Sequence, residues 1–147
     1  EGPRPTPGAL VAGGHLTGTM IAGGWHDELG VPADIVKGAC ALNGLHDLEP
    51  VMLAEVNEWI KLDPDSARRN SPIHHLPETG CPLIVSYGGN ETSEFKRQTD
   101  IFAEAWRKAG FPCTYVPMDE TNHFDIVFDF QNPDGRLMRA VRDMMGI

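Results

Sequence analysis

The chain has 147 residues, and its 12 basic and 21 acidic side chains give a formal net charge of −9. Nucleic-acid binding depends on a surplus of Lys and Arg, so this balance argues against a nucleic-acid partner. A hydrophobic content of 41% with 22% charged residues is typical of a folded globular domain. No apolar run reaches the ~18–20 residues of a membrane span, and the start lacks the apolar stretch of a signal peptide, so we expect a cytoplasmic protein without membrane contacts.

Strands are expected where the chain has short, nearly continuous apolar runs, at residues 35–43, 82–87 and 113–117. Continuous runs, unlike alternating ones, indicate strands that are covered on both faces, as in parallel sheets. Helical segments precede, separate and follow these strands. This alternation predicts the α/β class, with a parallel sheet flanked by helices.

Four helices are expected, at residues 13–25, 48–60, 94–109 and from about residue 132 onward. The first is rich in small residues, which suits a close approach of its backbone to a sheet. The second has an apolar stripe that includes Trp59, so we expect this side chain to pack in the core. The third is the clearest, because Phe95, Phe102 and Trp106 share one face and Gly110 suits the residue after its end.

The number of strands also bears on domain organisation, since three are few for a domain with helices on both faces of its sheet. The Pro- and Gly-rich residues 2–8 do not suit a buried strand. We therefore divide the chain into an irregular segment, residues 1–11, and a partial α/β domain, residues 12–147. An unpaired edge next to residues 35–43 predicts that the isolated chain dimerises, associates with missing chain segments or aggregates.

Polar residues that follow the strands are the candidates for chemistry, because ligands of parallel sheets bind beyond the carboxyl ends of the strands. Asp47 follows the first strand, Glu91 the second and His123 the third. An acid followed by a His is the second half of the Ser, acid, His order of one class of hydrolase triads. We predict that Glu91 faces Nδ1 of His123, with Asp47 as the second candidate acid.

Each candidate also has a purely structural explanation. Asp47 is better explained as the cap of the helix that follows it. Glu91 also suits the start of the helix at residues 94–109, where the helix dipole favours an acid, and His123 could be an ordinary loop residue. The remaining histidines lack any metal-ligand spacing, so neither a metal nor another cofactor is expected. They are His15, His26, His46, His74 and His75.

A nucleophile should precede the acid and the base, on a sharp G-x-S-x-G turn between a strand and a helix. The only candidate location is residues 9–16, where Val11 occupies the position of the Ser. Val has no group that can attack a carbonyl carbon, so this chain lacks the group that begins the reaction.

Five stretches occur in a specific order, namely residues 12–16 (AGGHL), 42–50 (LNGLHDLEP), 70–73 (NSPI), 87–98 (YGGNETSEFKRQ) and 122–125 (NHFD). Together they resemble the α/β-hydrolase superfamily, and within it the carboxyl-terminal half of the arylformamidase (kynurenine formamidase)-like esterases. The resemblance implies a serine-type hydrolase whose substrates are small carboxylic esters or aryl formamides such as N-formylkynurenine.

Carried to this sequence, the resemblance implies that His123 is the triad base, that Glu91 is the acid where many relatives have Asp, and that the amide of Ala12 is one donor of the oxyanion hole. Two departures stand out. Val11 replaces the nucleophile, and the family's amino-terminal half, with its HGG-type oxyanion loop, is not in this sequence. The alternative is therefore a non-catalytic α/β-hydrolase fragment that acts as a structural or interaction module.

Overall fold

The structure is a computed structural model that describes the backbone of residues 7–147 and the side chains of residues 13–147. Its elements in chain order, with η for a 3₁₀ helix, are α1 (Pro7–Ile21), α2 (Trp25–Leu29), β1 (Ala39–Leu42), η1 (Pro50–Leu53), α3 (Asn57–Ile60), α4 (Pro64–Arg69), η2 (Pro72–His74), β2 (Leu83–Ser86), α5 (Ser93–Lys108), β3 (Cys113–Tyr115), η3 (Ile126–Gln131) and α6 (Arg136–Met145). No helix in this part of the chain is both long and apolar enough to cross a membrane.

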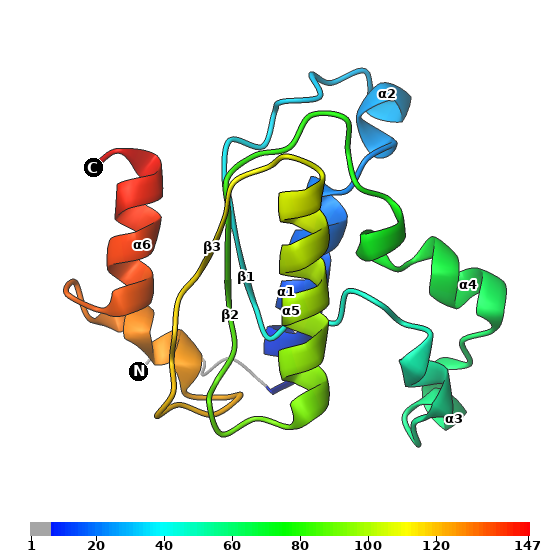
Figure 1. The fold of residues 1–147 in the computed structure, drawn as a ribbon. Helices are drawn as coiled ribbons and strands as arrows, with labels where there is room; N and C mark the ends of the chain where they lie inside the picture. The colour runs from blue at the N-terminus through cyan, green and yellow to red at the C-terminus, as the bar shows by residue number, and fades with distance from the viewer. Residues whose placement is uncertain (1–6) are drawn as a thin grey trace.

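The three strands form one parallel sheet in the order β1-β2-β3. Helices α1 and α5 cover one face of this sheet and α6 covers the other, while α3 and α4 lie to one side of it (Figure 1). The predicted architecture, a parallel sheet flanked by helices, is therefore confirmed. All three strands run in the same direction, so their carboxyl ends lie at one edge of the sheet, the lower edge in Figure 1.

The core consists of two apolar clusters, one on each face of the sheet. Leu83 and Val85 of β2 belong to the cluster under α5, which is centred on the fully buried Trp106. Ile84, between them in the sequence, belongs to the cluster under α6, together with Leu137. Because consecutive side chains of a strand point to opposite faces, a strand that is covered on both faces is apolar at every position. This explains the continuous apolar run of β2.

The prediction of one continuous helix at residues 48–60 is wrong, because this segment forms two short elements. Residues 50–53 form a 3₁₀ turn, Ala54 is extended, and a separate short helix begins at Asn57. The second half of the expected apolar stripe faces solvent, with Val56 48%, Trp59 82% and Ile60 50% exposed, while Leu48, Val51 and Met52 are half-buried. The prediction that Trp59 packs in the core is therefore wrong as well. An apolar stripe stabilises a helix only where another surface covers it, and the described residues leave the second half of this stripe exposed.

The first and last helices differ from their predicted bounds. Helix α1 begins at Pro7, inside the segment 1–11 that the sequence predicts to be irregular, and it ends at Ile21. The division of the chain between residues 11 and 12 stays a prediction. Helix α6 begins at Arg136 rather than near residue 132, because the side chain of Asp129 accepts a hydrogen bond from the amide of Leu137, at 2.7 Å, in its first turn.

Candidate active site

The loops that follow β2 and β3 lie together at the carboxyl edge of the sheet. The pairing of these two strands continues in a parallel bridge between Gly88 and Met118. Beyond this bridge, Nδ1 of His123 lies 2.9 Å from Oε2 of Glu91. The two side chains are 13% and 1% exposed, respectively. The structure thus shows the contact that the sequence predicts, while the catalytic roles of the two residues stay predictions.

The carboxylate of Glu91 is held by its own loop. Its Oε1 accepts a hydrogen bond from the amide of Gly88 at 2.9 Å, and the amide of Glu91 donates to the carbonyl of Gly88 at 3.0 Å. Oε2 is the atom that faces His123. The side chain therefore makes no capping hydrogen bond to helix α5, although Glu91 lies two residues before Ser93, where the helix dipole also favours an acid. A carboxylate can only accept hydrogen bonds, so this contact favours the tautomer of His123 that carries its proton on Nδ1.

Two glycines let the loops approach each other this closely. A Cβ atom on Gly88 would lie 2.7 Å from the backbone of Asn122, and one on Gly89 would lie 2.1 Å from the carbonyl oxygen of Asp119. Both distances are shorter than any normal contact of a Cβ atom. The Gly-Gly pair after β2 is therefore required by the contact between the two loops.

The imidazole of His123 is enclosed by aromatic rings. The ring centre of Phe95, in the first turns of α5, lies 4.7 Å from that of His123, and the ring of Phe124 meets it edge-on at 5.3 Å. Nε2 is buried and has no hydrogen-bond partner among the described residues. With the proton on Nδ1, Nε2 has a free lone pair. The arrangement can therefore accept a proton from a group placed at Nε2.

Asn43, directly after β1, is a site residue that sequence reasoning missed. Its side chain is fully buried, and its Nδ2 donates a hydrogen bond to the carbonyl oxygen of His123 at 3.1 Å. Its backbone adopts a left-handed conformation, with φ at 52°. The Asn-Gly pair after an apolar run indicates a turn rather than the last residue of a strand, and this signal could have identified the position.

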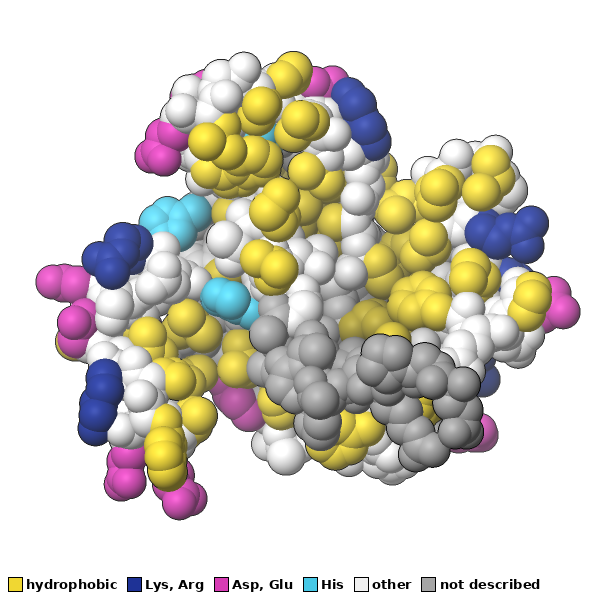
Figure 2. Space-filling view, turned by 180° about the vertical axis from the view of Figure 1, so that it is seen from behind, with side chains coloured by type: hydrophobic (Ala, Val, Ile, Leu, Met, Phe, Trp, Pro, Cys, Tyr) yellow, Lys and Arg dark blue, Asp and Glu magenta, His cyan; other side chains and the backbone are white. Residues whose placement is uncertain are grey.

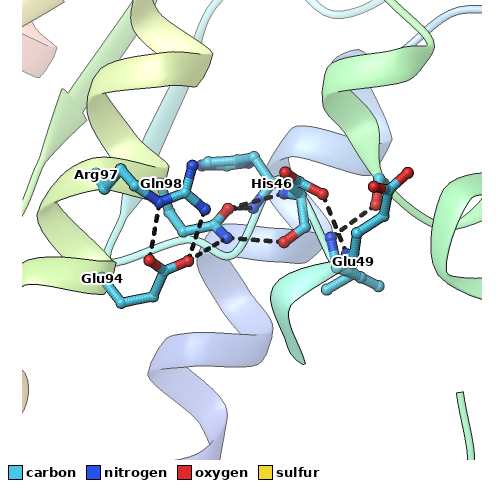
Figure 3. A network of polar contacts seen from close by, with 8 residues as sticks. His46, Glu49, Glu94, Arg97 and Gln98 are labelled. Carbon is cyan, nitrogen blue, oxygen red and sulfur yellow. Dashed lines mark hydrogen bonds and ion pairs between the residues drawn. The ribbon is translucent and has the colours of Figure 1, made fainter. Parts of the chain in front are cut away.

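The structure does not bring the second candidate acid, Asp47, to His123. Its Oδ1 accepts a hydrogen bond from the amide of Glu49 at 3.1 Å, so it caps the turn that leads into η1. Its backbone amide and carbonyl are both bound by the side chain of Gln98 (Figure 3). None of the hydrogen bonds found for Asp47 reaches His123, which supports the capping explanation.

Val11 and Ala12 lie within the bounds of α1, but their side chains fall outside the described residues. The helix just after them reaches the edge of the sheet that holds the dyad. A Cβ atom on Gly14 would lie 2.2 Å from the carbonyl oxygen of Leu42, the last residue of β1. Nδ1 of His15 forms a hydrogen bond with the carbonyl of Leu45 at 2.7 Å. The roles predicted for Val11 and Ala12 stay predictions.

His46 is a buried structural histidine between α1 and α5. Its ring stacks on Phe102 with 4.0 Å between ring centres. Burial, with a smaller contribution from nearby His15, lowers the pKa of His46 to about 3, so it is neutral near pH 7. Within the described residues, no group of three or more His, Cys, Asp or Glu side chains is arranged to hold a metal ion.

A consecutive parallel sheet, with a His after its last strand that contacts an acid after the preceding strand, is the arrangement of the carboxyl-terminal half of an α/β-hydrolase. Solved structures share this fold. A thioesterase-like protein from Silicibacter sp. matches 87% of this chain and 46% of its own, with 26% identity and a TM-score of 0.71. Esterase 2 of Thermogutta terrifontis matches 92% of this chain and 50% of its own, with 22% identity and a TM-score of 0.60.

The chain is also similar in sequence to two curated proteins, the kynurenine formamidases of Danio rerio and Salmo salar. Each is 29% identical, over 140 and 141 residues respectively, and each match covers 92% of this chain. The chain spans 47% of the length of either relative. No family model matches it. The resemblance to the carboxyl-terminal portion of arylformamidase-like α/β-hydrolases is confirmed by these comparisons.

Proposed function

We propose that this chain supplies the base and the acid of a serine-type hydrolase that acts on carboxylic esters or on aryl formamides such as N-formylkynurenine. The contact of 2.9 Å between Nδ1 of His123 and Oε2 of Glu91 carries the proposal, because it leaves Nε2 as a proton acceptor at the carboxyl edge of the sheet. The names of the relatives, kynurenine formamidase and esterase, support the substrate class.

In this mechanism, Nε2 of His123 removes the proton of a serine hydroxyl as its oxygen attacks the carbonyl carbon of the substrate. The protonated imidazole then gives this proton to the leaving alcohol or amine as the ester or amide bond breaks. Water repeats the attack on the acyl-enzyme with the same base. Glu91 keeps the proton on Nδ1 and stabilises the imidazolium that forms in each half of the reaction.

The 147-residue chain itself is expected to be inactive. Val11 cannot form an acyl-enzyme, so hydrolysis of p-nitrophenyl acetate should not exceed the background of free imidazole. Val11→Ser alone should restore little activity, since the sequence lacks the HGG-type loop and the loss of one oxyanion donor already costs ~10²–10³-fold in kcat. A burst of p-nitrophenol from the unmodified chain would contradict this assignment of the nucleophile position.

A chimera tests the proposal directly. The amino-terminal part of the Danio rerio relative, up to and including the residue aligned with Val11, is joined to residues 12–147 of this chain. We expect it to hydrolyse N-formylkynurenine and p-nitrophenyl acetate. His123→Ala and Glu91→Gln should each lower kcat by about 10⁴-fold. Asp47→Asn, which keeps the turn that Asp47 caps, is the matched control and should leave kcat within about threefold.

A folded chimera that is active with His123→Ala would contradict the proposal. Circular dichroism of each variant checks that a loss of activity is not a loss of fold. A second candidate function, a non-catalytic interaction module, is favoured by Val11, which no hydrolysis through an acyl-enzyme can use. That function predicts stable association of this chain with the amino-terminal part of a relative, without turnover even when a Ser stands at position 11.

A further inference from the structure

We propose that Asn43 is a positioning residue for the dyad. Its side-chain amide holds the backbone of His123, so that the imidazole remains against Glu91. The inference rests on the proposed function, because it gives Asn43 a role only through His123. Asn43 is not placed in contact with the substrate, and it takes no part in bond making or breaking.

The geometry links three strand ends. The backbone amide of Asn43 donates to the carbonyl oxygen of Ser86, at the end of β2, at 3.0 Å. This bond holds the backbone of Asn43 against the sheet. Oγ of Ser86 donates to the carbonyl of Val116, just after β3, at 2.6 Å. From this position Nδ2 of Asn43 reaches the carbonyl of His123, 80 residues later in the chain. The end of β1 is thereby connected to the loop that carries the base.

The conformation of Asn43 indicates that its side chain matters. A φ of 52° lies in the left-handed region, which Gly adopts without strain and which Asn and Asp tolerate better than other residues. The side chain of Asn43 is fully buried, and its Oδ1 has no hydrogen-bond partner among the described residues. The hydrogen bond from Nδ2 to the carbonyl of His123 is therefore the one polar contact that this side chain makes among the described residues, and it is directed at the loop of the base.

The loop of His123 is closed by its own hydrogen bonds, and it is tied to the rest of the molecule at two points: the carbonyl of Thr121 accepts from the amide of Asn90 at 3.0 Å, and the carbonyl of His123 accepts from Asn43. Oδ1 of Asn122 accepts hydrogen bonds from the amides of Phe124 and Asp125, and the carboxylate of Asp125 accepts from the amide of Asn122. Such a closed turn can move as a unit. The bond from Asn43 connects this turn to β1, so its loss should let the imidazole withdraw from Glu91 while the sheet stays folded.

The test uses ¹H and ¹⁵N NMR of the unmodified 147-residue chain, with labelled histidine, on the monomer or dimer fraction isolated by size-exclusion chromatography. The Nδ1 proton of His123 is identified as the low-field signal that Glu91→Gln removes. In Asn43→Gly, which fits the positive φ but lacks the amide, this proton should exchange with water about fivefold faster or more, as expected for the loss of one hydrogen bond. Asn43→Asp, which has nearly the same shape but no amide donor, should show the same change.

The matched control is Asn57→Ala. The side chain of Asn57 also donates to backbone carbonyls, those of Met52 and Leu62, but in a segment away from the dyad. Asn57→Ala should leave the exchange rate of the Nδ1 proton of His123 within about twofold of the rate in the unmodified chain, because no hydrogen bond near His123 is lost. Protection of the β2 backbone amides, measured on the same samples, reports whether the sheet stays folded.

Each outcome decides one question. If both Asn43 variants leave the exchange rate unchanged while Glu91→Gln removes the signal, Asn43 has no positioning role and the dyad stands. If Glu91→Gln leaves the signal in place, the dyad itself is wrong, and the proposed function fails with it. If an Asn43 variant loses the signal together with the protection of β2, its effect is structural and the positioning role is contradicted.

Discussion

The loops after β2 and β3 and the segment after β1 are built in opposite ways. Short polar side chains such as Asn122 and Asp125 bind the backbone of their own loop and place His123 against Glu91. Residues 50–60 instead expose Leu53 and Trp59 almost completely. A turn held by hydrogen bonds between neighbours can form by itself, whereas an apolar stripe needs a surface from elsewhere in the molecule.

The exposed apolar side chains are not confined to that segment. Seen from behind, they reach the surface over several separate elements (Figure 2). By exposed fraction, the exposed apolar side chains of the described residues also include Leu16 and Met20 of α1, Leu29 of α2 and Met145 of α6. The segment after β1 is nevertheless anchored at its start, where Gln98 binds the loop at Asp47 (Figure 3). The two regions therefore differ in their contacts: polar groups such as those of Asp47 are hydrogen-bonded within the chain, whereas the apolar side chains of Leu53 and Trp59 are left exposed to solvent.

Two tryptophans should separate the regions most clearly. Trp106 is fully buried in the core under α5, and Trp106→Ala should lower the free energy of unfolding by about 3–5 kcal/mol because it leaves a cavity. Trp59→Ala, at an exposed position, should change it by less than about 0.5 kcal/mol. Urea unfolding followed by circular dichroism measures both. Similar losses for the two variants would show that residues 50–60 are packed in solution.

The anchor at Gln98 is the next test. Its fully buried amide accepts from the amides of His46 and Asp47 and donates to Asp47 and Glu94. Gln98→Ala leaves two backbone amides without an acceptor, so the free energy of unfolding should fall by about 3 kcal/mol. Arg97→Ala, which breaks an exposed ion pair on the same helix, should cost less than about 1 kcal/mol. An equal cost for both would mean that the loop is not held by Gln98.

Acid should loosen the contact between α1 and the loop after β1 through His46. Burial lowers the pKa of His46 to about 3, against 6.5 for a histidine in water. Between pH 3 and pH 6.5, His46 binds a proton in the unfolded chain but not in the folded one. The contribution of neutral His46 to the free energy of unfolding is therefore complete above pH 6.5 and is lost as the pH falls towards 3. At pH 5 this loss amounts to about 2 kcal/mol. In His46→Phe, the fall in stability between pH 7 and pH 5 should be smaller by that amount.

Self-association tests the open surfaces. In the described part of the chain, β1 pairs only with β2, so its other edge presents free backbone groups. We expect the 147-residue chain to dimerise or aggregate in sedimentation experiments at low micromolar concentration. The double variant of Leu53→Ser and Trp59→Ser should weaken association by less than about tenfold, or ~1.4 kcal/mol, because the sheet edge stays open. A compact, reversible monomer would contradict the expectation of an open edge.

Part of the site could be predicted from the sequence, because it depends on a general property of parallel sheets. Glu91 and His123 follow adjacent strands, and the carboxyl ends of such strands meet at one edge. Asn43 and Gln98 were missed, since each acts on a segment far away in the sequence, 80 and 51–52 residues respectively. Gln98 lies on the same face of α5 as Phe95 and Phe102, at spacings of three and four, and this pattern could have marked it as buried.

The sequence alone determined the α/β class, the parallel sheet, the clear boundaries of α5, the two candidates Glu91 and His123, and the Val at position 11. These features follow from periodicity, capping residues and the order of elements, all of which are local. Only the tertiary structure decided that Glu91 rather than Asp47 faces His123, and that the stripe around Trp59 has no cover among the described residues. Hydrogen-bond partners and buried surfaces are formed by residues distant in sequence, so no local pattern specifies them.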